Sequence, residues 1–211
     1  MERERVFAAV AAERRRIADL VDSLDDDALA TPSLCTGWDV KTVAAHLVSV
    51  FADSFWTFQR AAIRYGGINR AIDELARSRA NAPAAEIART LRQRADHRLS
   101  PPLTGPLSGL TDVLVHGGDI RIPLGIPFRP DEEQVGWALD FLTGPRPFGF
   151  VPRGRLNGIA FHSTDIGRSW GVGAEIHGPA ALLMMAATGR VNILAMLDGP
   201  GVDVLRDRLA T

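Results

Sequence analysis

Two histidines and an aspartate have the types and spacing that metal chemistry requires in this chain of 211 residues. Asp112 and His116 stand four positions apart in "LTDVLVHGGDIRIPLG". In an α-helix this spacing places two side chains about 40° apart around the axis and one turn apart along it, so both point to one face. His46, in the apolar stretch "VKTVAAHLVSV", supplies a third donor if its own helix faces the first.

This set of donors would form a catalytic rather than a structural metal site. Facing helices of a bundle assemble metal sites from inward-pointing carboxylates and imidazoles. Three protein ligands leave positions open for water or substrate. The set suits zinc, which we expect, and also nickel, cobalt, iron or manganese. Such an ion lowers the pKa of a coordinated thiol or water and so provides a nucleophile at neutral pH.

The spacing by itself leaves other interpretations open. A histidine in an apolar helix is often a hydrogen-bonded core residue, and Asp112 could instead form a surface ion pair. Asp119, three residues after His116, could accept a hydrogen bond from an imidazole N–H or could cap backbone near the following glycines. Arg121 could contact an anionic substrate or cofactor, or be an ordinary surface arginine.

Most of the elements that must position these residues are helices. Asp39 is placed to cap the helix that carries His46, and Trp38 to pack at its start. A short helical turn is expected within residues 23–33. Apolar periodicity and Pro or Gly punctuation predict longer helices at residues 3–22, 40–64, 69–80, 83–99, 107–122 and 130–142.

The pattern changes after these helices. Residues 144–154, "GPRPFGFVPRG", contain six Gly or Pro in eleven positions and indicate a linker. Beyond it "RLNGIAFHST" and "SWGVGAEIHG" predict short strands, while "PAALLMMAATGR" and "GPGVDVLRDRL" predict helices. The expected fold class is therefore α+β, with a helical domain at 1–143, the linker at 144–154 and a small α/β domain at 155–211.

Composition narrows the possible partners. The net charge of −1 gives no electrostatic case for nucleic acid or an anionic membrane. No apolar run is long enough to span a bilayer, and the charged N-terminus does not resemble a signal peptide. Cys35 is the only cysteine, which fits a reducing cytoplasm. We expect a cytoplasmic protein with a small-molecule partner, and the sequence leaves its oligomeric state open.

Three blocks of the sequence carry a resemblance to a known family. "LCTGWDVKTVAAHL" resembles a segment of the mycothiol-dependent maleylpyruvate isomerase family, within the DinB-like superfamily of helical metalloenzymes. "DVLVHGGDIRIPLGIP" is similar to that family's later helix, where a carboxylate and a histidine four residues on complete the metal site. "STDIGRSWGVGAEIHGPAALLMMAATGR" and "LDGPGVDVL" resemble its small C-terminal α/β domain.

The resemblance implies a DinB-like four-helix-bundle domain whose metal ligands are His46, Asp112 and His116. The family usually has glutamate where this chain has Asp112, which is one methylene shorter, so either the helices approach more closely or a water intervenes. Mycothiol, the low-molecular-weight thiol of actinobacteria, would be the cosubstrate. Lys41 is the single lysine among 24 basic residues, which agrees with a GC-rich bacterial source.

The implied activity is that of an isomerase or S-transferase acting on a small electrophilic substrate. Two alternatives remain open. The same bundle could hold a hydrolase that uses metal-bound water, or a non-catalytic protein that binds a metal or a small molecule.

Overall fold

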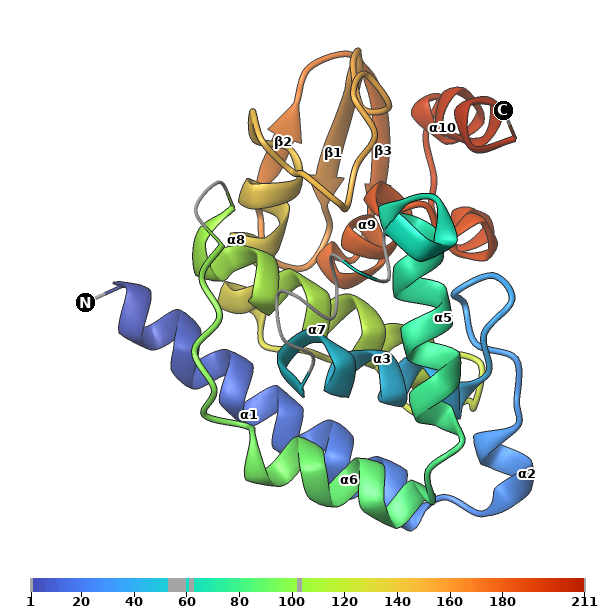
Figure 1. Cartoon of the computed structure of the whole chain (residues 1–211). Coiled ribbons are helices and arrows are strands. Elements are labelled where there is room, and N and C mark those ends of the chain that lie inside the picture. The colour runs from blue at the N-terminus through green and yellow to red at the C-terminus, as the bar shows by residue number, and fades with distance from the viewer. Residues whose placement is uncertain (1, 53–59, 61–62, 102–103, 211) are drawn as a thin grey trace. The chain divides into compact units, whose positions relative to one another are not determined.

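The computed structural model describes residues 2–52, 60, 63–101 and 104–210 of the chain (Figure 1). Helices make up most of these residues, and one small sheet lies in the sequence between α8 (Glu132–Leu142) and α9 (Ala180–Ala187), which confirms the α+β class. Contacts divide the chain into two compact units. The first comprises Met1–Leu99 and His116–Pro127, and the second comprises Ser100–Val115 and Phe128–Thr211.

The elements of the first unit are all helical. They are α1 (Glu2–Ser23), α2 (Asp26–Leu29), α3 (Val40–Ala52), α5 (Ile68–Ala80) and α6 (Ala84–Gln93). A further continuous helix, α7 (Gly105–Arg121), contributes residues to both units. The second unit also holds α8 (Glu132–Leu142), β1 (Ile159–Ser163), β2 (Ser169–Gly171), β3 (Ala174–Gly178), α9 (Ala180–Ala187), the 3-10 helix η1 (Val191–Met196) and α10 (Gly201–Leu209).

Apolar faces hold the first unit together. Helix α1 packs along α6, and α3 packs along α5 (Figure 1). The apolar residues at helical spacing in each helix are the buried ones. Examples that are 0% exposed are Ile17 and Val21 in α1, Val43 in α3 and Leu91 in α6. Helical periodicity in the sequence therefore predicted which face of each helix is buried.

Buried charge on α1 decides where α6 ends. Arg14 is only 3% exposed, and its guanidinium donates to the Ala95 carbonyl at 3.1 Å and the His97 carbonyl at 2.8 Å. The guanidinium thus donates hydrogen bonds to carbonyl groups just beyond the end of α6, where backbone C=O groups have no partner within the helix. The prediction that this helix continues to residue 99 is wrong, because α6 ends at Gln93.

A second buried charge joins α1 to α7. Glu13 is 4% exposed and forms an ion pair with Arg121 at 3.0 Å. Gly117, inside α7, makes room for this pair: a Cβ there would lie 2.8 Å from Arg121 Nη1 and 3.1 Å from Glu13 Oε1. A glycine inside a helix is therefore explained here by close packing.

The second unit is built on the sheet, whose strand order is β2-β1-β3. Strand β1 pairs antiparallel with β2 and parallel with β3, so Phe161 lies between Trp170 and Ile176. These three side chains are buried and share one face of the sheet. Helix α9 contacts both α8 and the sheet.

Most predicted elements of the C-terminal half are present within a few residues. The strands and α9 and α10 lie inside the segments expected for them, whereas η1 was not predicted. The predicted helix 40–64 is seen as α3, and its later part falls largely outside the described residues. The domain boundaries at 143 and 155 remain a prediction, while contacts group α8 with the sheet. None of the described helices is long and apolar enough to cross a membrane.

The cap of α3 provides a first test of these local interactions. Asp39 Oδ1 accepts from the Thr42 amide at 2.7 Å, as predicted for the residue before the helix. We expect Asp39→Ala to lower the free energy of unfolding by about 1 kcal/mol, measured by urea denaturation followed by circular dichroism.

The matched control is Asp25→Ala, which removes the cap of the four-residue α2, where Asp25 Oδ1 accepts from Ala28 at 2.8 Å. This variant should cost less, since α2 positions only one buried side chain, Leu29. An equal loss in the free energy of unfolding in both variants would show that the cap of α3 stabilises the fold no more than the cap of α2.

Candidate metal centre

The three predicted ligand residues come together on α3 and α7. One ligand atom from each of His46, Asp112 and His116 lies within 4.8 Å of the others, and within the described residues this is the one such group of His, Cys, Asp or Glu. A tetrahedral ion about 2.1 Å from each donor requires the donor atoms to lie about 3.4 Å apart. The most widely separated donor atoms would therefore have to approach by up to about 1.4 Å.

Both imidazoles lie in the helical interior. His46 is 8% exposed and His116 is 9% exposed, and their ring centroids are 4.8 Å apart in an edge-on arrangement at 73°. His46 is surrounded on its own helix by side chains that are almost fully buried, such as Ala45 and Leu47. Asp112 is partly exposed, one helical turn before His116.

A buried carboxylate fixes the orientation of one ring. Asp119 is fully buried, and its Oδ2 lies 2.9 Å from His116 Nδ1. When Nδ1–H donates to this oxygen, the lone pair of the neutral ring is on Nε2, which is the atom left to bind an ion. Metal-binding histidines commonly have such a carboxylate partner. The spacing of three residues had suggested this contact as one of two possibilities for Asp119.

Trp38 packs over both histidines. Its ring centroid lies 5.2 Å from that of His46 and 6.4 Å from that of His116, and the residue is 9% exposed. The indole therefore covers one side of the imidazole pair with apolar surface. The sequence predicted packing for Trp38 at the start of the helix, but not its contact with both rings.

A compact loop places Trp38. The Trp38 amide donates to the Cys35 carbonyl at 3.0 Å, and the Trp38 carbonyl accepts from the Ser33 amide and hydroxyl, each at 2.9 Å. Gly37 has a φ of +80°, a conformation in which a side chain would be strained. Leu34 N–H donates to the Asp119 carbonyl at 3.3 Å, which ties this loop to α7.

An acid and a base on α5 hold the indole. Trp38 Nε1 donates to Asp73 Oδ1 at 2.6 Å. The Arg77 Nε lies 3.0 Å from both oxygens of Asp73, and its Nη2 donates to the Gly37 carbonyl at 2.9 Å. This group was not predicted from the sequence, although the spacing of four residues between an Asp and an Arg on one helix indicates an ion pair.

The same contacts shift the ionisation of Asp73. Burial raises the pKa of this carboxyl, but the hydrogen bonds from Arg77 and Trp38 and the charge of Arg77 together hold the pKa below its ordinary value of 3.8. Asp73 is therefore ionised at neutral pH and accepts the indole N–H as a carboxylate.

Arg121 is engaged in the protein interior. Its side chain is 13% exposed, pairs with Glu13 and donates from Nη1 to the Gly117 carbonyl at 3.2 Å. The expectation of a surface arginine is wrong for this residue. Its alternative role, contact with an anionic cofactor or substrate, remains a prediction and would require the buried pair with Glu13 to open.

Comparison with known proteins indicates a family for the first part of the chain. Residues 10–101 match the family model described as the mycothiol maleylpyruvate isomerase N-terminal domain. This match, over 92 of the 211 residues, confirms the resemblance for that segment of the chain. It includes His46 and ends before Asp112 and His116. No curated protein matches the chain.

Two solved structures share the fold. One is the crystal structure of a mycothiol-dependent maleylpyruvate isomerase, with 13% identity, a TM-score of 0.62 and 89% of each chain covered. The other is a histidine-to-alanine mutant of a mycothiol-dependent maleylpyruvate isomerase, with 12% identity, a TM-score of 0.60 and the same coverage. At these identities the similarity shows the fold.

The link between Asp73 and Trp38 leads to a prediction about pH. The folded-state pKa of Asp73 is lowered. The contribution of its carboxylate to the stability of the fold is therefore present above pH 3.8 and is lost as the pH falls through the lowered pKa. In protein labelled with fluorotryptophan, we expect the Trp38 fluorine resonance to show a shift below pH 3.8 that reports protonation of Asp73. Trp38→Phe identifies that resonance. In Asp73→Asn the shift should disappear, and a shift that persists there would assign the titration to another group.

The contact between Asp119 and His116 leads to a prediction about metal affinity. Asp119→Asn keeps the size of the side chain but weakens the acceptor, so we expect zinc affinity to fall about 10- to 100-fold in competition with a chelator. Asp140→Asn, which alters a carboxylate that accepts from Trp170 Nε1 at 2.8 Å in the second unit, should leave it unchanged. Unaltered affinity in a folded Asp119→Asn protein would contradict this role for Asp119.

Proposed function

We propose that this protein is a divalent-metal-dependent enzyme that uses mycothiol as its thiol cosubstrate and acts on a small electrophilic molecule. The reaction would be of the isomerase or S-transferase type. In the first, the thiolate adds to an activated cis double bond and leaves after rotation about the new single bond. In the second, it displaces a leaving group and stays attached to the carbon.

The observation that carries this proposal is the meeting of His46, Asp112 and His116. One donor atom from each lies within 4.8 Å of the others, in a chain whose residues 10–101 match the mycothiol maleylpyruvate isomerase N-terminal domain. Two imidazoles and one carboxylate fit zinc and leave coordination positions open. When bound, such an ion would supply the Lewis acidity that lowers the pKa of a thiol.

The surrounding residues would prepare this site. By accepting from Nδ1–H, Asp119 would hold His116 in the tautomer that presents Nε2, and the indole of Trp38 would keep water from one side of both rings. Asp112 is more exposed than the histidines, so a thiol or substrate would approach from its side. A single cysteine and the use of a thiol cosubstrate fit a reducing cytoplasm.

The first test is metal content. We expect protein purified without a histidine tag to carry about one divalent ion per chain by mass spectrometry, and His46→Ala and His116→Ala to lose it. The matched control is His97→Ala, which removes an exposed histidine of the same unit. Absence of metal in the native protein, even after reloading with zinc, would contradict the proposal.

The second test separates the alternatives. The metal-loaded protein is assayed on electrophilic substrates with mycothiol, with glutathione and without thiol. Turnover that requires mycothiol supports the proposal. Metal-dependent ester hydrolysis without thiol would identify a hydrolase, and stoichiometric metal without turnover would favour a binding protein.

A further inference from the structure

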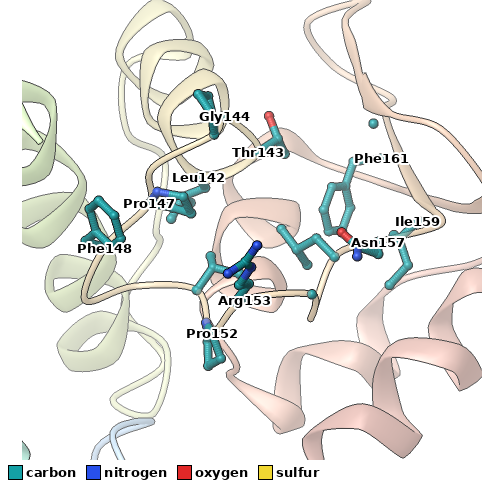
Figure 2. A pocket seen from close by; sticks show the side chains of 15 residues that line it. Leu142, Thr143, Gly144, Pro147, Phe148, Pro152, Arg153, Asn157, Ile159 and Phe161 are labelled. Carbon is teal, nitrogen blue, oxygen red and sulfur yellow. The ribbon is translucent and has the colours of Figure 1, made fainter. Parts of the chain in front are cut away.

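We propose that a pocket in the second unit, separate in its chemistry from the metal centre, binds a small organic monocarboxylate with a compact apolar body. The pocket has a volume of about 460 Å³ and lies between the end of α8, the loop that follows it and β1 (Figure 2). We call it the loop pocket. The residues that define it are Leu142, Phe148, Arg153, Asn157, Ile159 and Phe161.

The lining of the loop pocket is mainly apolar. Leu142, Ile159 and Phe161 are each 1% exposed and provide walls that belong to the core. Phe148, by contrast, is 56% exposed, which is unusual for a phenylalanine and leaves its ring available to a ligand. Ligand sites typically have volumes of roughly 300–1,000 Å³ with apolar walls and a few polar groups, and the loop pocket fits this description.

The polar groups at the pocket carry positive charge without a compensating acid. Arg153 is the one charged side chain among the lining residues. Within the described part of the chain, neither the Arg153 guanidinium nor the Asn157 side-chain amide has a hydrogen bond or ion pair. In Figure 2 the Arg153 guanidinium lies in the view between Phe148 and Asn157. An arginine fork and an amide N–H₂ are suitable donors for a carboxylate.

The turn that carries these two donors is held in place. The Arg155 amide donates to the Pro152 carbonyl and the Asn157 amide to the Gly154 carbonyl, each at 3.1 Å. From α10, Arg208 Nη1 donates to the carbonyls of Arg155 and Asn157, both at 2.7 Å. A turn fixed in this way loses little further freedom when a ligand binds.

These features select one kind of occupant. A neutral apolar molecule would gain nothing from the exposed Arg153 guanidinium, and inorganic phosphate would gain nothing from the apolar walls. A second carboxylate would have to lie against apolar side chains or return to water. A single carboxylate on an aromatic or branched aliphatic body satisfies both parts of the loop pocket.

Benzoate is the probe for the test, with benzamide, acetate and inorganic phosphate as comparison compounds. The full chain is titrated by calorimetry, and amide resonances are followed by NMR. We expect benzoate to bind most tightly and to shift the amides of residues 153–159 and Gly171. Arg153→Gln should weaken benzoate about two- to fivefold and leave benzamide nearly unchanged, because it removes a charge-assisted hydrogen bond at an exposed site.

Two further variants make the result specific. Phe148→Ala should weaken benzoate and benzamide alike by several-fold, since it removes apolar contact. Arg129→Gln is the matched control, an exposed arginine of the same unit that does not line the pocket, and should leave benzoate binding unchanged. His46→Ala should also leave benzoate binding unchanged. The proposal for the loop pocket and the proposal for the metal centre can therefore be overturned independently of each other.

Three outcomes would overturn the proposal. One is the absence of benzoate binding at millimolar concentration. Another is phosphate binding as tightly as benzoate, which would indicate a general oxyanion site. The third is evidence that benzoate binds elsewhere, given either by an equal loss in Arg129→Gln and Arg153→Gln or by amide shifts confined to other residues.

Discussion

The packing of two imidazoles and an indole inside a helical core is the constraint on which the site depends. His46, His116 and Trp38 are each less than 10% exposed, and their ring centroids lie 4.8–6.4 Å apart. Rings of this kind gain from burial of their carbon surface, but their N–H groups are costly to bury without an acceptor. The neighbouring helices must therefore bring polar partners into the interior.

Two carboxylates meet this requirement for His116 and Trp38. Asp119 comes from the same helix as His116, and Asp73 comes from α5. Asp73 is in turn held by Arg77, which also reaches the backbone of the loop before α3. The result is a connected set of hydrogen bonds in which α5, this loop and α7 each restrict a ring beside the predicted ligands. Such pre-positioning keeps ligand side chains from reorganising when an ion binds.

Buried charges on α1 support the same arrangement from outside the site. Glu13 pairs with Arg121 one turn after His116, and Arg14 closes the end of α6. Breaking such a buried pair is strongly destabilising, because one charge is then left without a partner. Gly117, directly after His116, explains part of this role, because it is small enough for Glu13 and Arg121 to meet beside it.

The sequence by itself determined most of the helices and strands and which residues form the candidate site. Apolar periodicity indicated the buried faces of α1 and α3, and Asp39 indicated where α3 begins. The spacing of Asp112 and His116 placed both on one side of α7. These features could be predicted because each is a property of a short stretch of chain. Tertiary structure decided the rest. The end of α6 depends on Arg14, some 80 residues away, and the acceptor of Trp38 comes from another helix. The approach of His46 to His116 likewise depends on how separate helices pack, which no local pattern specifies.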